Sequence, residues 1–289
     1  MVSVQVPATS ANLGPAFDCL GIALDLRMRC ALEELAKGLV IEGCPAKYAN
    51  EENLVYRAYQ AAMKRLRLPV KGLRLVIDSD IPPSRGLGSS AAAIVAGIAG
   101  AYLLHGLPLD RQAILALAAE LEGHPDNAAA AVYGGLRASM REGEHYDCVP
   151  FPLSATIRFT ALVPDFELST HKARAVLPAL VTRQDAVYNI SHSLALVSAL
   201  ICGDMALLRR AMRDRLHQPY RLPLIPGAQR LWDLASGLGA AVYISGAGPT
   251  LMCIHDQGDF PVIVQGILPD GWQAFGLRTD VQGAVEIPQ

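Results

Sequence analysis

The sequence Ile-Pro-Pro-Ser-Arg-Gly-Leu-Gly-Ser-Ser-Ala-Ala-Ala, residues 81–93, decides what the rest of the chain must fold around. Both glycines can adopt positive φ and let another group come close to the backbone. Ser89 or Ser90 can cap the helix that we expect to begin at Ala91. The free N–H groups of its first turn, together with the helix dipole, attract an anion. The stretch therefore predicts an anion-binding loop, most often one for phosphate.

Two other glycine-loop patterns fit less well. A Walker A loop needs Gly-Lys-Ser or Gly-Lys-Thr after the glycines, and the sequence has neither. The spacing does match the dinucleotide pattern Gly-x-Gly-x-x-Ala, which directly follows a strand and leads to a second strand that ends in an acid. Here Pro82 and Pro83 separate the strand from the glycines, and residues 110–122 predict another helix. The pattern therefore disfavours a Rossmann domain.

Composition sets the broad class of the protein. The chain has 289 residues, of which 52% are hydrophobic, enough for one large domain or two modest ones. The net charge is −2 and no long basic run occurs, which gives a nucleic-acid partner little support. The six cysteines form no Cys-x-x-Cys pair, so neither a zinc site nor a disulfide framework is indicated.

The N-terminus and the apolar segments bear on location. Residues 1–7 lack the basic start and apolar core of a signal peptide. The longest apolar run, residues 91–104, is shorter than the roughly 20 residues that span a bilayer. We therefore expect a cytoplasmic protein without a membrane partner.

Hydrophobic periodicity places strands and helices along the chain. We expect one helix to present Val187, Ile190, Leu194, Val197 and Ile201 on its apolar face, and the next to expose four arginines to solvent. The second half alternates strands and helices as a split βαβ domain does, with a boundary near residues 151–155. The predicted strands are 2–6, 22–33, 73–77, 157–163, 240–244, 251–254 and 272–278, and the predicted helices are 51–66, 90–104, 110–122, 128–132, 187–201, 205–216, 228–236 and 261–267.

The segment Glu-Gly-His-Pro-Asp-Asn, residues 122–127, crowds four functional side chains into six positions. Proline, aspartate and asparagine also favour a turn, and alone that explanation would suffice. Beside an anion loop, an active site is equally well supported. If a nucleoside triphosphate lies on the loop, Mg²⁺ would take oxygen ligands from Glu122, or from Glu120 as second choice, and from the hydroxyl of Ser89 or Ser90.

Acidic and basic side chains occur in separate predicted loops. Asp18 and Asp126 can hold an ammonium group, whereas Arg174 and Arg221 can hold a carboxylate with two hydrogen bonds. A zwitterionic amino acid would need both kinds of anchor. No lysine or well-placed aspartate is evident as a base, so we favour catalysis by positioning and charge stabilisation.

Several of these stretches together resemble the homoserine kinase family of the GHMP small-molecule kinases. The glycine motifs alone are typical of the superfamily, and the other segments are typical of homoserine kinases. The resemblance spans nearly the whole chain. It rests on residues 6–21, on Pro-Ser-Arg-Gly-Leu-Gly-Ser-Ser-Ala (83–91), on 122–127, on 163–170 with Arg174, on 217–221 with 224–227, and on Ser-Gly-Ala-Gly-Pro-Thr (245–250).

The resemblance implies an α+β fold of two domains, 1–155 and 156–289. The first would be similar to ribosomal protein S5 domain 2 and the second would be a ferredoxin-like split βαβ domain. It implies transfer of the γ-phosphate of ATP, with Mg²⁺, to the side-chain hydroxyl of L-homoserine in threonine biosynthesis. It also implies a dimer, with which the small apolar helices are compatible.

The resemblance also assigns roles to residues. Asn127 would lie near the reacting hydroxyl, with Asp126 the nearest acid. Asn53 would lie near the nucleotide base, and Ser90 and Glu122 would hold the metal. The nucleotide loop would comprise Pro83, Ser84, Arg85, Gly86, Leu87, Gly88, Ser89, Ser90 and Ala91. Homoserine would be bound by Asn12, Asp18, His124, Asp126, Thr170, Arg174, Arg221 and Gly246.

The chain departs from the family pattern at two places. Ala16 stands where the family usually has glycine, and a positive φ there would cost roughly 1 kcal/mol and shift Asp18. Residues 128–131 are all alanine where Val-Ala-Pro-Ala is usual, a change we expect to affect packing only. Two alternatives stay open: another kinase of the superfamily, acting on mevalonate or a sugar, and a catalytically silent relative that binds nucleotide or a partner.

Overall fold

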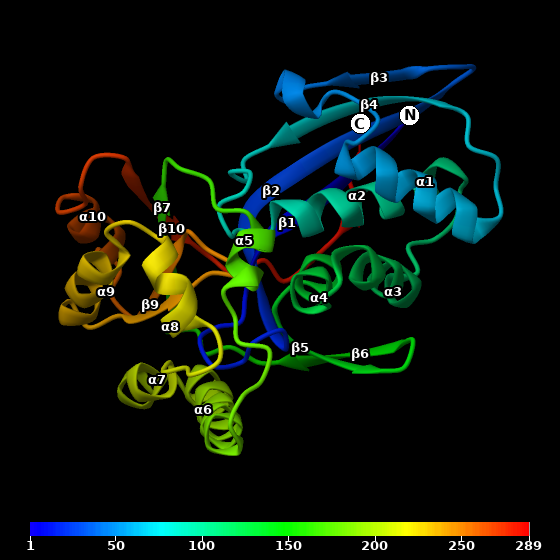
Figure 1. The fold of residues 1–289 in the computed structure, drawn as a ribbon. Helices are drawn as coiled ribbons and strands as arrows, with labels where there is room; N and C mark the ends of the chain where they lie inside the picture. Colours follow the sequence, from blue (N-terminus) through cyan, green and yellow to red (C-terminus); the bar gives the residue numbers. More distant parts are fainter. Residues whose placement is uncertain (289) are drawn as a thin grey trace.

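The structure is a computed structural model that describes residues 1–288, and it contains two sheets (Figure 1). The larger sheet follows the order β11-β1-β2-β4-β3, with β5 and β6 joined to one end of β2. Because β2 is 16 residues long, it pairs with β4 over Met28–Leu35 and with β5 over Leu20–Ile22. The strands are β1 (Val2–Ala11), β2 (Leu20–Leu35), β3 (Leu39–Glu42), β4 (Gly72–Ser79), β5 (Leu136–Glu142), β6 (His145–Phe151) and β11 (Val285–Glu286).

Four helices cover one face of this sheet (Figure 1). The central one, α2 (Ser89–Leu104), is buried from Ala91 to Ala101. Its small residues are required by close packing, since a Cβ on Gly97 would lie 2.1 Å from the carbonyl oxygen of Val55. The others are α1 (Leu54–Leu66), α3 (Arg111–Glu122) and α4 (Asp126–Tyr133), and a short 3₁₀ turn, η1 (Ala46–Tyr48), precedes α1.

The smaller sheet has the antiparallel order β10-β7-β9-β8, the arrangement of a split βαβ domain. This confirms the fold class expected from the sequence. The strands are β7 (Arg158–Pro164), β8 (Ala241–Ile244), β9 (Leu251–His255) and β10 (Trp272–Leu277). The helical elements are α5 (Thr170–Ala175), α6 (Arg183–Cys202), α7 (Met205–Ala211), α8 (Gln218–Arg221), η2 (Leu222–Leu224), α9 (Ala228–Gly237) and α10 (Phe260–Gln265).

The end of the chain returns to the first sheet. Beyond β10, Thr279 bridges to Leu24, and β11 pairs with β1. The last residues therefore lie on the N-terminal sheet, although they follow the C-terminal sheet in sequence. The division into 1–155 and 156–289 stays a prediction.

Three local expectations were wrong. Helix α2 begins at Ser89 with Gly88 as its N-cap, and neither serine caps it, because Gly88 has φ +68° and its side chain is a hydrogen atom. The helix predicted over 205–216 ends at Ala211, because residues 212–217 fold around a buried carboxylate. The short strand β3 and the hairpin of β5 and β6 were not predicted.

Candidate active site

The glycine loop packs tightly on β1. A Cβ on Gly88 would lie 1.8 Å from Thr9 Oγ1, so only glycine fits here. The backbone N–H of Thr9 donates to the carbonyl of Leu87 at 3.1 Å, which fixes the loop against the strand. No side chain caps α2, so the N–H groups of its first turn remain available to an anion.

The same loop is held from the other side by the turn between β8 and β9. Ser245 Oγ donates to the carbonyl of Gly86 at 2.6 Å, and Thr250 N–H donates to the carbonyl of Arg85 at 3.2 Å. The guanidinium of Arg85 donates to the carbonyls of Pro164 (2.9 Å) and Asp165 (2.6 Å) at the end of β7. Arg85 therefore anchors the loop to the C-terminal sheet.

Glu122, at the end of α3, faces the start of α2. Ser90 Oγ donates to Glu122 Oε1 at 2.5 Å, while Glu122 Oε2 is buried without a hydrogen-bond partner among the described residues. Burial raises the pKa of Glu122, although His124 and the Ser90 hydroxyl act to lower it. Glu120 points to the surface, where it pairs with Arg65 and its side chain is 64% exposed. Of the two candidate acids, only Glu122 thus faces the start of α2 beside the glycine loop.

The first turn of α4 connects this corner to β1. Asp126 Oδ1 lies 2.7 Å from His124 Nδ1 and accepts from the N–H of Asn127 at 2.8 Å. Burial lowers the pKa of His124, but the hydrogen bond and charge of Asp126 outweigh it and raise that pKa overall. Asn127 Oδ1 accepts from Thr9 Oγ1 at 2.7 Å. Thr9 therefore joins the glycine loop to the acidic end of α4.

Two of the predicted site residues, in the loop after β1, lie in the left-handed region. Asn12 has φ +73° and Asp18 has φ +56°. The Asn12 side chain accepts from the N–H of Asp18 at 2.9 Å and donates to the carbonyl of Gly246 at 2.8 Å. Ala16 is not among the described residues with positive φ, so alanine carries none of the strain anticipated for it.

Asp18 and Arg174 form a pair with two hydrogen bonds, of 3.0 and 2.7 Å. The charge of Asp18 raises the pKa of Arg174 against the opposing effect of burial. Ligand atoms of Asp18, His124 and Asp126 lie within 4.8 Å of one another. Loops that the sequence could not place together therefore meet, and two residues expected to hold opposite ends of a ligand bind each other.

Arg221 is the largest fully buried side chain, with 1% exposure. It donates to the carbonyls of Ala173 (3.1 Å) and Gly246 (2.9 Å), and it lies 5.0 Å from the ring centroid of Phe17. Burial, reinforced by the charge of Arg174, lowers the pKa of Arg221 to about 10. Within residues 1–288, the hydrogen-bond partners of Arg221 do not include a carboxylate.

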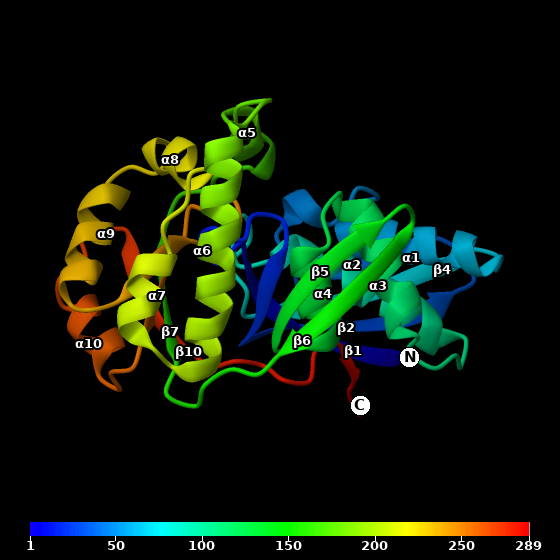
Figure 2. The same ribbon diagram turned by 90° about the horizontal axis from the view of Figure 1, so that it is seen from below.

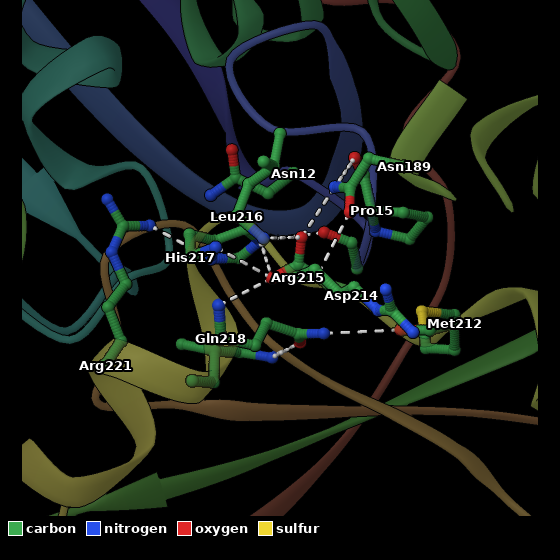
Figure 3. Close-up of polar contacts among 12 residues, drawn as sticks. Asn12, Pro15, Asn189, Met212, Asp214, Arg215, Leu216, His217, Gln218 and Arg221 are labelled. Atoms are coloured by element: carbon green, nitrogen blue, oxygen red, sulfur yellow. Dashed lines mark hydrogen bonds and ion pairs between the residues drawn. The ribbon is translucent and has the colours of Figure 1, made fainter. Parts of the chain in front are cut away.

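Asp214 was not identified as a site residue from the sequence. Figure 3 shows its carboxylate among its hydrogen-bond partners. It is fully buried and accepts from Asn189 Nδ2 (2.6 Å) and from the N–H groups of Leu216 (2.9 Å), His217 (2.9 Å) and Gln218 (2.6 Å). These bonds shape the turn that leads into α8 and Arg221. An aspartate shortly before a helix with proline in its first turn is a capping signal, and this signal could have identified Asp214 from the sequence.

Asn189 extends this network to the loop after β1. Its Nδ2 also donates to the carbonyl of Pro15 at 2.8 Å, and its Oδ1 accepts from the N–H of Arg215 at 2.9 Å (Figure 3). The Nε2–H group of the buried His217 donates to the carbonyl of Gly14 at 2.7 Å, and burial lowers the pKa of His217 to about 4. The network therefore ties α6 and α8 to residues 14–15.

Two predicted residues have other contacts. Asn53 is the N-cap of α1, where its Oδ1 accepts from Val55 N–H and its Nδ2 donates to the carbonyl of Tyr48. A contact to a nucleotide base stays a prediction for it. Thr170 is exposed at the start of α5, one helical turn before Arg174.

The two domains and the glycine loop between them define a small-molecule kinase of the GHMP class. Family models of the GHMP kinases N terminal domain and the GHMP kinases C terminal match residues 53–135 and 195–267. A homoserine kinase of Clostridium botulinum is 42% identical over 99% of this chain and 98% of its own, and one of Clostridium beijerinckii is 40% identical over 99% of both. The chain belongs to the homoserine kinase family.

Solved structures agree with this assignment. The homoserine kinase of Cytophaga hutchinsonii superposes with a TM-score of 0.86 and 28% identity, covering 99% of this chain and 97% of its own. A mevalonate kinase from Methanococcus jannaschii shares the fold alone, with a TM-score of 0.70 and 14% identity over 96% of this chain and 98% of its own. The predicted family, the GHMP kinase fold and an ATP-using kinase are therefore confirmed.

Proposed function

We propose that this kinase transfers the γ-phosphate of ATP to the side-chain hydroxyl of L-homoserine, forming O-phospho-L-homoserine for threonine biosynthesis. The observation that carries the proposal is the convergence of opposite charges beside the glycine loop. The buried cation of Arg221, bonded to backbone carbonyls, shares the site with the carboxylates of Asp18 and Asp126. A free amino acid brings one carboxylate and one ammonium group, which is the complement of that set.

The pair of Asp18 and Arg174 gives this binding a physical route. A bound amino acid can offer its carboxylate to Arg174 and Arg221 and its ammonium to Asp18 and Asp126. The internal ion pair is thereby exchanged for two pairs with the ligand, so no charge is left unpaired in a half-buried site. Asn12, Thr170, His124 and the carbonyl of Gly246 complete the proposed set of contacts. A neutral sugar would not replace the pair in this way.

The nucleotide would lie on residues 83–91, with phosphate oxygens accepting from the free N–H groups of α2. Ser90 Oγ and the two oxygens of Glu122 fit Mg²⁺, because they are hard oxygen donors and Glu122 Oε2 is buried with no partner of its own among the described residues. Bound Mg²⁺ would neutralise charge that develops on the transferred phosphoryl group. Magnesium stays a proposal.

The reacting hydroxyl would lie near Asn127, which Thr9 holds 2.7 Å away at the edge of the glycine loop. The carboxylate of Asp126 is already engaged by His124 and by the N–H of Asn127. We therefore propose that the rate is raised by alignment of the hydroxyl and by electrostatic stabilisation, without a strong general base. We also propose action in the cytoplasm, with small molecules as the ligands.

Turnover of ATP by the purified chain, with homoserine, mevalonate or galactose as acceptor, tests the proposal. We expect homoserine alone to stimulate turnover, and Arg221→Met to raise the KM for homoserine at least tenfold, the change in affinity that about 1.4 kcal/mol produces. The exposed Arg210→Met is the matched control and should change neither constant. No stimulation by homoserine would refute the acceptor, and no turnover with any acceptor would favour a silent relative.

A further inference from the structure

Thr9 lies where the glycine loop and the acidic end of α4 meet, and its side chain is fully buried. Helices α2 and α4 lie side by side over the sheet that contains β1 (Figure 2). From β1, Thr9 contacts Gly88 at the start of α2 and Asn127 in the first turn of α4. The neighbouring Ser10 faces the other side of the strand, where its hydroxyl lies 2.8 Å from that of Ser245. One buried hydroxyl, that of Thr9, therefore touches both helix starts.

The hydrogen bonds of Asn127 leave its amide a single orientation. The carboxylate of Asp126 only accepts hydrogen bonds, and its Oδ1 lies 3.4 Å from Asn127 Nδ2. The amide nitrogen must therefore face Asp126, which leaves Asn127 Oδ1 toward Thr9. An amide oxygen only accepts, so Thr9 Oγ1 is the donor of the 2.7 Å bond. Without that donor, Asn127 Oδ1 would have to turn toward another partner, because the residue is only 9% exposed.

The nitrogen side of this amide is the side that a ligand can use. The contact from Asn127 Nδ2 to Asp126 is long, so these N–H groups are only weakly engaged within the chain. The same oxygen of Asp126 is already bonded at 2.7 Å to His124 and at 2.8 Å to the backbone N–H of Asn127. Asn127 Nδ2 is thus free to donate to an oxygen atom of a bound ligand.

The Thr9 side chain is itself fixed by the glycine loop. A Cβ on Gly88 would lie 1.8 Å from Thr9 Oγ1 and 3.0 Å from Thr9 Cβ, so the loop backbone packs directly against this side chain. The backbone N–H of Thr9 donates to the carbonyl of Leu87 at 3.1 Å. A β-branched side chain also has few allowed χ1 values. The hydroxyl, and with it the amide of Asn127, is therefore held at a set position relative to the start of α2.

We propose that Thr9 is a positioning residue, which turns the amide nitrogen of Asn127 toward the acceptor hydroxyl and keeps it aligned with the glycine loop. The inference rests on the proposed function, because it needs an acceptor beside Asn127 and ATP on the loop. Thr9 is buried, so it acts through Asn127 and touches neither ligand. Phosphoryl transfer depends on alignment of the attacking oxygen with the phosphate. Loss of the Thr9 hydroxyl should therefore lower kcat and leave both KM values nearly unchanged.

A role in packing alone predicts a different pattern. If Thr9 only supported the glycine loop, its replacement would act on nucleotide binding and raise the KM for ATP. Thr9→Val keeps the shape of the side chain and removes the hydroxyl, whereas Thr9→Ser keeps the hydroxyl and removes the methyl group. The first variant therefore tests the hydrogen bond, and the second tests the packing.

Steady-state kinetics with ATP and homoserine, followed by release of ADP and of the phosphorylated acceptor, measure the effect. We expect Thr9→Val to lower kcat by about ten- to a hundredfold, the cost of a misplacement of up to about an ångström. Both KM values, and the kcat of Thr9→Ser, should stay within about threefold of the wild type. The matched control is Thr160→Val, which changes a second fully buried threonine, whose Oγ1 lies 2.8 Å from His255 Nε2 in the C-terminal sheet. It should lower the melting temperature and leave kcat unchanged.

A double-mutant cycle shows whether Thr9 acts through Asn127. In Asn127→Ala there is no amide to orient, so adding Thr9→Val should lower kcat no further. An equal fall in both backgrounds would overturn the proposal. So would a wild-type kcat in Thr9→Val, a raised KM for ATP as its main change, or a Thr9→Ser enzyme as slow as Thr9→Val. Thr9→Ala differs from Thr9→Ser by the hydroxyl alone, and this pair decides the question if Thr9→Val does not fold.

The outcome is separable from that of the proposed function. The variants are compared with the acceptor that the wild type phosphorylates. If this is mevalonate or galactose, the proposed acceptor fails while the role of Thr9 is still decided. If homoserine is phosphorylated and Thr9→Val is unimpaired, only the role of Thr9 fails. A wild type that phosphorylates none of the three would overturn both.

Discussion

Replacing Asp214 with asparagine tests whether one buried carboxylate organises the acceptor side of the site. Each oxygen of Asp214 accepts two hydrogen bonds: Oδ1 from Asn189 and Leu216, and Oδ2 from His217 and Gln218. Asparagine keeps one oxygen and puts an amide donor where the other was. That donor would face two N–H groups, which cannot accept from it.

The size of the effect follows from those contacts. Two of the four hydrogen bonds are lost, and a bond to a charged acceptor contributes about 1.5–3 kcal/mol. We expect the free energy of unfolding to fall by about 3–6 kcal/mol. At roughly 2–4 °C per kcal/mol for a chain of this size class, the melting temperature should fall by on the order of 10 °C.

Thermal and urea unfolding measure the stability, and steady-state kinetics well below the new melting temperature measure the function. The turn that Asp214 shapes leads to Arg221, and Asn189 links it to Pro15. We therefore expect the KM for the amino-acid acceptor to rise and the KM for ATP to change little. Asp185→Asn is the control: its ion pair with Arg215 lies at the surface, so only a small loss of stability is expected.

Two results would refute this reasoning. A melting temperature within about 2 °C of the wild type would mean that the four bonds are compensated elsewhere, since they predict a fall several times larger. Equal increases in KM for ATP and for the acceptor would mean that the turn supports the whole fold and has no particular role on the acceptor side.

Three further predictions concern the nucleotide loop, the metal and acid stability. Gly88→Val should abolish turnover, measured by ADP release, because its Cβ would lie 1.8 Å from Thr9 Oγ1; retained turnover would show that the loop can shift. Glu122→Gln should raise the Mg²⁺ concentration needed for half-maximal activity, whereas the exposed Glu120→Gln should not; equal effects would reject the assignment. Burial lowers the pKa of His255 from 6.5 to about 4, so between these values the unfolded chain binds the proton and stability is lost as the pH falls. Between pH 7 and about pH 4 the melting temperature of His255→Asn should therefore fall less than that of the wild type. An equal fall in both proteins would contradict this.

Local signals in the sequence were enough for much of the fold. The alternation in residues 73–77 and the small residues of 90–104 are local patterns that can be read without knowing which segments pack against them, so β4 and α2 were predicted nearly in full. By contrast, β3 has only four residues and depends on its parallel pairing with β4. A segment that short has no periodicity of its own from which to predict it.

The candidate site was predicted in its residue types more than in its contacts. The pairing of Asp18 with Arg174 joins residues 156 positions apart, and no local pattern encodes that distance. Asp214 was placed in a helix because its neighbours favour one. The bond from Asn189, 25 positions away, belongs to the tertiary structure and decides otherwise. The exposure of Leu194 on the apolar face of α6 was likewise beyond the sequence, since periodicity fixes the apolar stripe and not the side that water reaches.

The two halves of the site are connected through one turn. Ser245 donates to the carbonyl of Gly86 in the nucleotide loop, and the carbonyl of the next residue, Gly246, accepts from both Asn12 and Arg221 on the acceptor side. A Cβ on Gly86 would lie 2.4 Å from the carbonyl oxygen of Ser245, so the two backbones are in close contact and no side chain fits between them. We therefore expect a displacement of residues 245–246 to move the glycine loop and the side chain of Arg221 together. The glycine loop, which contains no lysine, is held to the C-terminal sheet by the hydrogen bonds of Arg85 and Ser245.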